Sequence, residues 1–143
     1  MNVTKLVQDA ALGPLVEAGR AEGLDFMWRL QLELSAGDFD RPRTTLFGSF
    51  SGTELVGVGG LTPDLYPDAQ PGVGRLRHLY VSPRCRRQGV GKALVLVVLK
   101  EARQHYRKVR LRTDTAAAAR FYETLGFVPN TERYATHELA LSK

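Results

Sequence analysis

Hydrophobic positions recur along the chain with two different periods. Short stretches rich in β-branched and aromatic residues are typical of β-strands, and longer stretches with an apolar residue every three or four positions are typical of helices. We expect strands over residues 3–7, 44–50, 54–61, 76–81, 109–112 and 137–142. We expect two helices within residues 8–36, broken near Gly23, and further helices over 90–106 and 116–125. Strands interspersed with helices in this way indicate an α/β layer fold.

Glycine and proline mark the connections between these elements. Residues 51–53 read Ser-Gly-Thr between two predicted strands, which indicates a tight hairpin turn. Residues 62–74 contain three prolines, so we expect an ordered surface loop there. That loop fits either a lid over a binding site or a plain connection between two strands, and both interpretations stay open. Gly126 directly follows a predicted helix and is a typical helix stop.

The length and composition of the chain predict a single domain. At 143 residues it can bury a core without disulfides or metals. No apolar run is long enough for a membrane span, and the first residues, MNVTKLVQDAALG, lack the basic and then apolar layout of a signal peptide. The single cysteine, Cys85, excludes an internal disulfide and a cysteine-clustered zinc site and suits a reducing compartment. We therefore expect a cytoplasmic protein with no membrane partner.

The positive charge of the chain is concentrated in one segment. The net charge is +5, but residues 75–120 hold 13 of the 20 lysines and arginines and only two of the 15 acidic residues. That segment alone therefore has a charge of +11, and the rest of the chain has a charge of −6. Such asymmetry predicts that a polyanion binds at one place on the fold: nucleic acid, membrane headgroups or a phosphorylated cofactor.

A candidate anion site lies at residues 84–94, RCRRQGVGKAL, where a predicted strand passes into a predicted helix. The first N–H groups of a helix have no intrahelical acceptor and carry a partial positive charge, and glycine lets a phosphate approach the backbone closely. The side chains of Arg86, Arg87 and Lys92 would add charge-assisted hydrogen bonds. The segment therefore predicts a cradle for phosphate groups.

Two common phosphate-binding loops do not fit this segment. A Walker A loop requires glycine five residues before its Gly-Lys pair and serine or threonine after it, but Arg86 and Ala93 stand at those positions. The dinucleotide fingerprint requires a third glycine where Leu94 stands. Both kinds of loop are therefore excluded.

The pattern that does fit, Arg86-x-x-Gly89-x-Gly91 after the strand LRHLYVSP, closely resembles the acetyl-CoA pyrophosphate motif of the GNAT superfamily of N-acetyltransferases. AARFYETLGF, at residues 118–127, resembles the second signature of that family, Phe-Tyr on a helix followed by Gly-Phe. The clear resemblance covers residues 76–127. It implies a single α/β domain over residues 1–143 with a central, mostly antiparallel mixed sheet flanked by helices.

The resemblance also implies roles for particular residues. Leu79 and Val81 would pair through their backbone groups with the pantetheine arm of acetyl-CoA. Thr115 stands where the family often has an asparagine that contacts the cofactor. Tyr122 matches the tyrosine that protonates the departing thiolate of coenzyme A. The residues that would surround the pyrophosphate are Arg86, Arg87, Gln88, Gly89, Val90, Gly91 and Lys92.

The chemistry of a phenol suits the role implied for Tyr122. With an ordinary pKa of about 10 it is protonated at neutral pH, and it can donate to a sulfur whose conjugate acid has a pKa of about 8.5. The competing interpretation is an aromatic side chain that only packs beside Phe121. The Phe-Tyr-x-x-x-Gly-Phe context favours the catalytic role.

The general base is less evident in the sequence. Some members of the family use Glu or His on the strand before the loop, on the face that corresponds to Leu79 and Val81. Regular strand alternation would place Arg75 and Arg77 on that face and His78 on the opposite one. An arginine is always protonated and cannot act as a base, and His78 is then a structural residue.

We therefore assign the two arginines to substrate binding as a hypothesis. Arg75 and Arg77 would hold a carboxylate or phosphate of the acceptor. The proton of the amine would leave through water or through a carboxylate in the helix-loop region before residue 45. The candidate carboxylates are Glu33, Asp38 and Asp40.

The function expected from the resemblance is transfer of an acetyl group from acetyl-CoA to a primary amine of a small molecule or peptide, by direct attack in a ternary complex. Dimers are common in this family, so the resemblance also suggests a homodimer. One alternative is a non-catalytic member that senses acetyl-CoA. Another is a basic nucleic-acid-binding module, but the chain lacks the interleaved aromatic residues and helix-turn-helix spacing of such modules. We expect no nucleic-acid partner.

Overall fold

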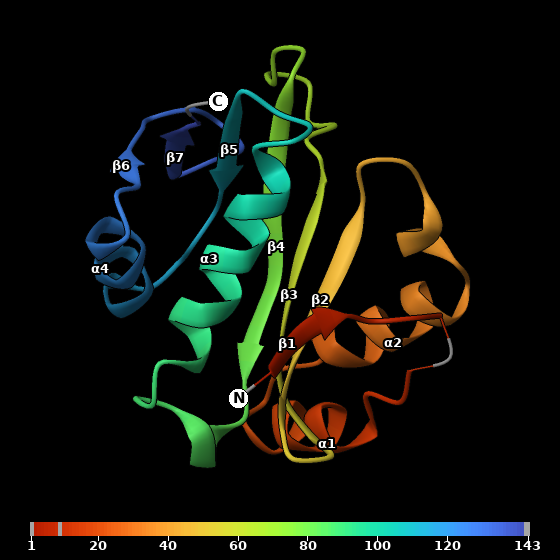
Figure 1. The fold of residues 1–143 in the computed structure, drawn as a ribbon. Coiled ribbons are helices and arrows are strands. Elements are labelled where there is room, and N and C mark those ends of the chain that lie inside the picture. Colours follow the sequence, from red (N-terminus) through yellow and green to blue (C-terminus); the bar gives the residue numbers. More distant parts are fainter. Residues whose placement is uncertain (1, 9, 142–143) are drawn as a thin grey trace.

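Seven strands form one open sheet in the order β1-β2-β3-β4-β5-β7-β6 in a computed structural model that describes residues 2–8 and 10–141 (Figure 1). All neighbouring strands are antiparallel except β4 and β5, which are parallel. The strands are β1 (Asn2–Lys5), β2 (Thr45–Ser51), β3 (Glu54–Pro63), β4 (Val73–Val81), β5 (Lys108–Leu111), β6 (Val128–Pro129) and β7 (His137–Ala140). The predicted α/β fold with a mostly antiparallel mixed sheet is confirmed.

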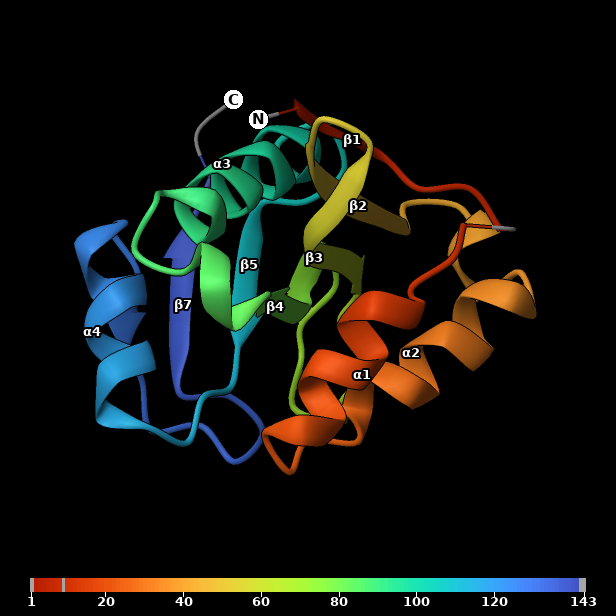
Figure 2. The ribbon, with the colours of Figure 1, turned by 90° about the horizontal axis from the view of Figure 1, so that it is seen from below.

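Helices cover both faces of this sheet (Figure 2). The helices α1 (Gly13–Ala21) and α2 (Phe26–Ser35) lie on one face, and α3 (Val90–Ala102) crosses the other. The helix α4 (Ala116–Thr124) adds Tyr122 to the core beneath α3. Two 3-10 turns, η1 (Asp38–Asp40) and η2 (Pro83–Cys85), follow α2 and β4.

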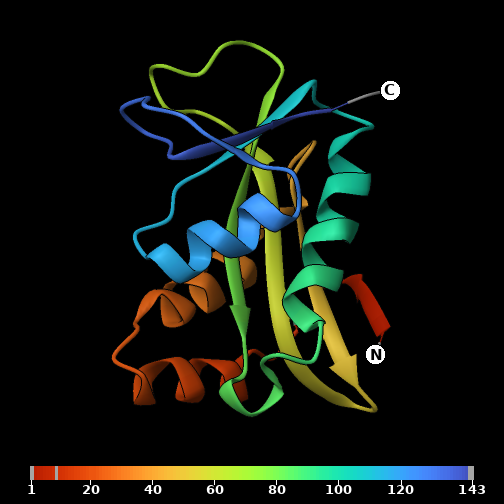
Figure 3. The same ribbon diagram turned by 90° about the vertical axis from the view of Figure 1, so that its left-hand side faces the viewer.

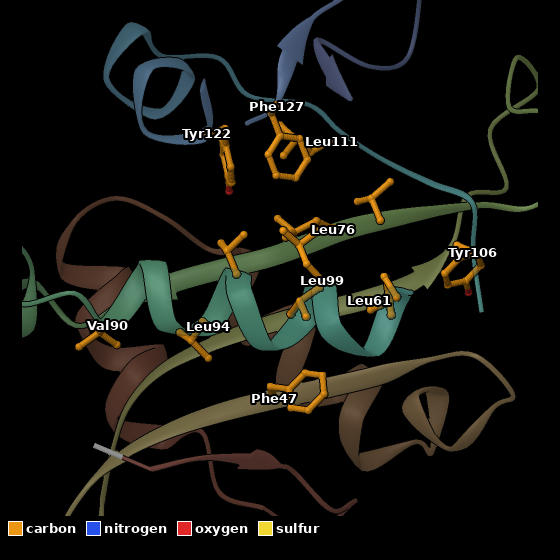
Figure 4. Packing of buried hydrophobic residues seen from close by; sticks show 14 of the residues in the cluster. Phe47, Leu61, Leu76, Val90, Leu94, Leu99, Tyr106, Leu111, Tyr122 and Phe127 are labelled. Carbon is orange, nitrogen blue, oxygen red and sulfur yellow. The ribbon is translucent and has the colours of Figure 1, made fainter. Parts of the chain in front are cut away.

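Each face of the sheet has its own apolar core. The larger core lies under α3, whose inward positions are all apolar and nearly inaccessible, as Figure 4 shows for Val90, Leu94 and Leu99. The second core joins α1 and α2 to the opposite face through Leu15, Met27 and other residues. Burial of one large aliphatic side chain stabilises a fold by roughly 1.5–3 kcal/mol. The helices are therefore held mainly by these buried faces.

The predicted elements are present, with shifted ends. The helices of the N-terminal region separate near Gly23, which has a φ of +78°, as the sequence indicated. Four predicted elements are shorter than expected: β1 ends at Lys5, α3 ends at Ala102, α4 ends at Thr124 and β7 ends at Ala140. Residue 142, the end of the last predicted strand, lies outside the described residues. The two-residue strand β6 was not predicted, because Val128–Pro129 is too short to show a periodic pattern.

The strands β4 and β5 separate soon after they meet. They pair only where Val73–Arg75 lies beside Lys108–Arg110, and β5 then leaves β4, as Figure 3 shows. The second half of β4 therefore pairs with β3 on one edge and with no described strand on the other. Beyond this short pairing, the sheet is therefore open between β4 and β5.

A β-bulge interrupts β4 at the same place. Arg77 pairs with Gly60 and Tyr80 with Val58, so His78 and Leu79 together stand opposite one residue of β3. His78 has a φ of +60°, in the left-handed region that non-glycine residues seldom adopt. Regular alternation of side chains therefore stops at this point of the strand.

Candidate functional site

The turn between β4 and α3 presents a row of free backbone donors. Within the described residues, none of the N–H groups of residues 87–92 donates a hydrogen bond. Arg87 and Gly89 have φ angles of +62° and +82°, which curl the turn, and Gly89 is the N-cap of α3. Such a curl of consecutive N–H groups at a helix N-terminus is a binding place for anions. A β-carbon at Gly89 would meet no atom within 4 Å, so the glycine is needed for its backbone angle.

The Arg86 side chain clamps this turn to the rest of the molecule. Its Nη1 and Nη2 donate to the two carboxylate oxygens of Glu22 at 2.7 and 2.6 Å, and its Nε donates to the carbonyl oxygen of Val81 at 3.1 Å. The hydroxyl of Tyr80 donates to the same carboxylate at 2.6 Å. The hydrogen bonds from Arg86, and then from Tyr80, hold the pKa of Glu22 below its ordinary value. The Arg86 side chain is thus already paired.

Other cations of the segment remain exposed around the turn. Arg87 and Lys92 have no acidic partner within 4 Å among the described residues, whereas Arg84 contacts Glu54 of β3. The contact of Glu22 with Tyr80 and Arg86 was not predicted, because Glu22 lies 58 residues from Tyr80 and 64 residues from Arg86 in the sequence. No local pattern could have indicated this contact.

Tyr122 lies on α4, the helix that follows β5. Its ring extends from α4 toward the core beneath α3, as Figure 4 shows, and contacts Phe121 and Phe127 edge-on at centroid distances of 5.1 and 5.6 Å. The residue is 7% exposed, and its hydroxyl makes no hydrogen bond within the described part of the chain. Burial raises the pKa of Tyr122 to about 12. The phenol is therefore a protonated donor without an acceptor.

Leu79 and Val81 lie on the α3 face of β4, and Thr115 lies at the start of α4. Leu79 and Val81 pack against the larger core, and their strand edge is the free one. The carbonyl oxygen of Val81 also accepts from Arg86. The hydroxyl of Thr115 accepts from the N–H of Ala118 at 3.1 Å and so caps α4.

A cavity of about 450 Å³ opens on the opposite face of β4. The elements that form it are α2, η1, the loop after η1, the end of β3, the loop that follows it, and β4. Its lining residues are Glu33, Asp38, Phe39, Arg41, Pro42, Thr44, Thr62, Pro63, Leu65, Tyr66, Arg75, Arg77 and His78. Glu33 and Asp38 therefore reach the cavity, whereas Asp40 is not among its lining residues.

The bulge in β4 overturns the predicted faces of that strand. Arg75 and Arg77 line the cavity, but Leu79 and Val81 pack toward α3, so the two pairs do not share a face. The prediction that His78 points away from the arginines is also wrong, since His78 lines the same cavity. The reason is that two residues of β4 stand opposite one residue of β3, which shifts the alternation by one position.

His78 is held neutral in this cavity. Burial, and then the positive charges of Arg77 and Arg29, lower the pKa of His78 to about 4. Its Nε2 atom is buried and makes no hydrogen bond within the described residues, and Glu33 Oε2 lies 3.6 Å from it. The imidazole therefore presents an unoccupied nitrogen beside a carboxylate.

Arg75 belongs to a buried cluster of ion pairs. Its Nη1 donates to Asp64 Oδ2 at 3.1 Å, its Nη2 donates to the carbonyl oxygen of Tyr134 at 2.8 Å, and its guanidinium lies 4.4 Å from the centroid of the Tyr66 ring. Arg110, 1% exposed, donates to both carboxylate oxygens of Asp64 at 2.8 and 3.0 Å. The cluster ties the loop after β3 to β4 and β5.

No group of three or more His, Cys, Asp or Glu side chains within residues 2–8 and 10–141 is placed to hold a metal ion. Among the helices of these same residues, none has the length and apolar character needed to cross a membrane.

Comparisons with known proteins agree on one family. The model of the acetyltransferase (GNAT) family matches residues 13–127. The chain is 40% identical to human N-acetyltransferase 8 over 77 residues and 34% identical to rat N-acetyltransferase 8F1 over 112 residues. These matches cover 52% and 73% of the chain. The chain spans only 34% and 51% of the length of these two relatives.

Solved structures show the same fold. A protein from Exiguobacterium sp. 255-15 described as an acetyltransferase superposes with a TM-score of 0.84 and 28% identity, over 98% of this chain and 94% of that one. The PaiA N-acetyltransferase from Thermoplasma acidophilum, solved in complex with coenzyme A, superposes with a TM-score of 0.67 and 17% identity, over 98% of both chains.

Proposed function

The chain belongs to the GNAT acetyltransferase family, and from this premise we propose that it transfers an acetyl group from acetyl-CoA to a primary amine of a small molecule or peptide. The observation that carries this proposal is the row of free N–H groups at residues 87–92, beside the free edge of β4. A pyrophosphate would accept from these N–H groups, with Arg87 and Lys92 as the nearby free cations. Gln88, Gly89, Val90 and Gly91 would contribute through their backbone.

The roles of Leu79, Val81, Arg86 and Thr115 are part of the same proposal. The free edge of β4 at Leu79 and Val81 would receive the extended pantetheine arm as an added strand. Arg86 would act through its clamp on the turn rather than by direct contact, because its guanidinium is already paired with Glu22. Thr115 would contact the cofactor only from its capping position.

The bound acetyl-CoA would supply a thioester carbonyl that the amine attacks and a thiolate that leaves. The hydroxyl of Tyr122 would donate its proton to the sulfur, because it is protonated and without another acceptor at the end of a buried ring. Burial weakens this phenol as an acid, but the same apolar surroundings also make the thiolate a stronger base.

On the other face of β4, we assign proton removal to His78 together with Glu33. The neutral imidazole has a free Nε2, and Glu33 lies 3.6 Å from it. The nitrogen of the amine becomes acidic as its bond to the carbonyl carbon forms, so a weak base is sufficient at that moment. Because Nε2 is shielded from solvent, the proton would pass from the amine nitrogen to the carboxylate of Glu33, which lines the cavity beside Nε2.

Release of coenzyme A thiol tests the proposed reaction. The purified chain is supplied with acetyl-CoA and a panel of primary amines, and free thiol is measured with and without each amine. We expect amine-dependent thiol release and a matching acetylated product. Retained binding of acetyl-CoA without thiol release on any amine would instead support a sensor.

The proposal also includes the extent of the domain, its location and its assembly. All described strands belong to one sheet, which supports one catalytic domain over residues 1–143. The single cysteine supports a reducing, cytoplasmic location. Assembly as a homodimer stays a prediction, to be measured by light scattering of the purified chain.

A further inference from the structure

The cavity on the α2 face of β4 contains one cation without a counterion. Arg75 is paired with Asp64, and Arg41 Nη2 lies 3.6 Å from Asp38. Arg77 also lines the cavity, is exposed, and has no carboxylate within 4 Å among residues 2–8 and 10–141. An unpaired guanidinium at the wall of a cavity is suited to bind a carboxylate or phosphate of a ligand.

The bulge places this cation directly beside His78. Arg77 and His78 are consecutive residues, so their Cα atoms are only about 3.8 Å apart. In a regular strand their side chains would lie on opposite faces, but both line this cavity. Glu33 adds a carboxylate 3.6 Å from His78. The cavity therefore carries a positive group next to a place that suits an amine.

This arrangement suits a ligand with two polar ends. Arg77, His78 and Glu33 line the same cavity, so one small dipolar molecule can place an acidic group at Arg77 and an amine beside Glu33 and His78. The other walls of the cavity include Phe39, Leu65 and Tyr66, which can contact an apolar side chain.

Building on the function proposed above, we propose that the acceptor is an amino acid with a free acidic group, because an unpaired guanidinium and a carboxylate line the same cavity. Arg77 binds the acidic group, and Glu33 with His78 receives the amine. Arg75, for which sequence analysis suggested the same role as for Arg77, instead holds the cavity wall through Asp64.

The test compares matched acceptors on matched variants. Phenylalanine and phenylalaninamide differ only in the negative charge, and kcat/KM is measured for both with the wild type, Arg77→Gln and Arg41→Gln. For each enzyme, kcat/KM with phenylalanine is divided by kcat/KM with phenylalaninamide, and these ratios are compared between the enzymes. The different basicity of the two amines affects every ratio equally and therefore cancels. Arg41→Gln is the control, because Arg41 lines the same cavity but is paired with Asp38.

We expect Arg77→Gln to lower the acid-to-amide ratio by about 10- to 100-fold, the range for a lost charge-assisted hydrogen bond. Arg41→Gln is expected to keep the wild-type ratio. An equal loss for acid and amide in Arg77→Gln would overturn the proposal.

A binding measurement separates this proposal from the reaction itself. Calorimetry with phenylalanine, in the presence of coenzyme A, needs no turnover. Suppose that no amine releases thiol, but phenylalanine binds the wild type and does not bind Arg77→Gln. The proposed reaction is then wrong, and the proposed acceptor site is supported. If amines react but the ratio does not depend on Arg77, the reaction stands and the acceptor class is wrong.

Discussion

Tyr122 has a buried ring and an unpaired hydroxyl. Its ring contacts Phe121 and Phe127 edge-on, and its hydroxyl has no hydrogen-bond partner among the described residues. The oxygen is not one of the fully buried polar atoms that lack a partner in this part of the chain, so it keeps some contact with solvent. A reacting group can therefore reach it.

We expect Tyr122→Phe to lower kcat by about 100-fold or more, because general acid catalysis contributes about 10²- to 10⁴-fold. The substitution keeps the aromatic packing, so the melting temperature should fall little. Tyr106→Phe is the matched control: Tyr106 is also buried, with its pKa raised to about 12, but its hydroxyl donates to the carbonyl of Arg43. A kcat of Tyr122→Phe within twofold of the wild type would contradict the assigned role.

His78 predicts a dependence of stability on pH. Its pKa is lowered to about 4 in the folded chain, against about 6.5 for an unperturbed histidine. Between these values the unfolded chain binds the proton and the folded chain does not, so the free energy of unfolding rises with pH from about 4 to 6.5. The full effect is on the order of 3 kcal/mol.

The pH effect is measured by urea unfolding of the wild type and His78→Gln at several pH values in this window. The charged groups around His78 are Glu33, Arg77 and Arg29. We expect the variant to lose most of the rise between pH 5 and 6.5. An identical rise in both proteins would show that His78 is not the responsible group.

The turn before α3 depends on α1 for its shape. Glu22, at the C-cap of α1, joins the Arg86 side chain and the Tyr80 hydroxyl. We expect Glu22→Gln to weaken acetyl-CoA binding by about tenfold, because one charge-assisted hydrogen-bond pair contributes about 1.5 kcal/mol or more. Calorimetric titration measures this affinity.

Arg84→Gln is the matched control for that variant. Arg84 lies in the same segment but contacts Glu54 of β3. We expect its affinity to change less than threefold, within the range of an exposed ion pair. Equal effects of the two substitutions would mean that general charge, rather than the clamp at Glu22, determines affinity.

The loop between β3 and β4 is anchored by the buried cluster around Asp64. Burial by itself would raise the pKa of Asp64, but hydrogen bonds from Arg110, from the backbone of Tyr66 and from Arg75 outweigh it, and the pKa is lowered. Arg110 also pairs with Asp68 and Glu132. Of the two interpretations of this loop, these contacts favour a fixed wall of the cavity over a lid.

We expect Arg110→Met to destabilise the fold by about 3–5 kcal/mol, because it leaves a buried carboxylate without its main partner. Urea unfolding at pH 7 measures the loss. The lowered pKa of Asp64 means that this contribution is present above about pH 4 and is lost as the pH falls through the folded value, so wild type and variant should converge at low pH.

A double variant provides the control for Arg110→Met. Asp64→Asn together with Arg110→Met removes both charges of the main pair. If the pair acts as a unit, the double variant loses less stability than the sum of the two single variants. Simple additivity would show that Asp64 and Arg110 stabilise the fold separately.

The molecule as a whole consists of two parts of one sheet that share only a short seam. Three residue pairs join β4 to β5, and α3 packs across β2, β3, β4 and β5. A ligand bound along the free edge of β4 and at the N-terminus of α3, with its thioester at Tyr122 of α4, would contact both parts. It should therefore stabilise the entire fold.

We expect acetyl-CoA at 100 times its dissociation constant to stabilise the chain by about 2.7 kcal/mol, which corresponds to a rise in melting temperature of several degrees. A single-stranded oligonucleotide at equal phosphate concentration is the control and should cause no comparable rise. A larger rise with the oligonucleotide would favour the nucleic-acid alternative despite the family match.

Local patterns were sufficient for most of the elements and for the position of the turn that carries the free N–H groups. The free N–H groups of residues 87–92 follow from a strand, a glycine turn and a helix that are neighbours in sequence. The Phe-Tyr segment was likewise found in the sequence because its residues are consecutive. The resemblance to the GNAT family was carried by these two segments, and the family model matches the wider range of residues 13–127.

The faces of β4 and the partners of its charged residues were decided only in three dimensions. One bulge at His78 moved the histidine into the cavity with Arg77, and no alternation of apolar residues reveals a bulge beforehand. Arg86 pairs with Glu22, 64 residues away in the sequence, and Arg75 pairs with Asp64, 11 residues away. Periodicity reports contacts within a turn or a strand, whereas ion pairs depend on which segments the folded sheet brings together.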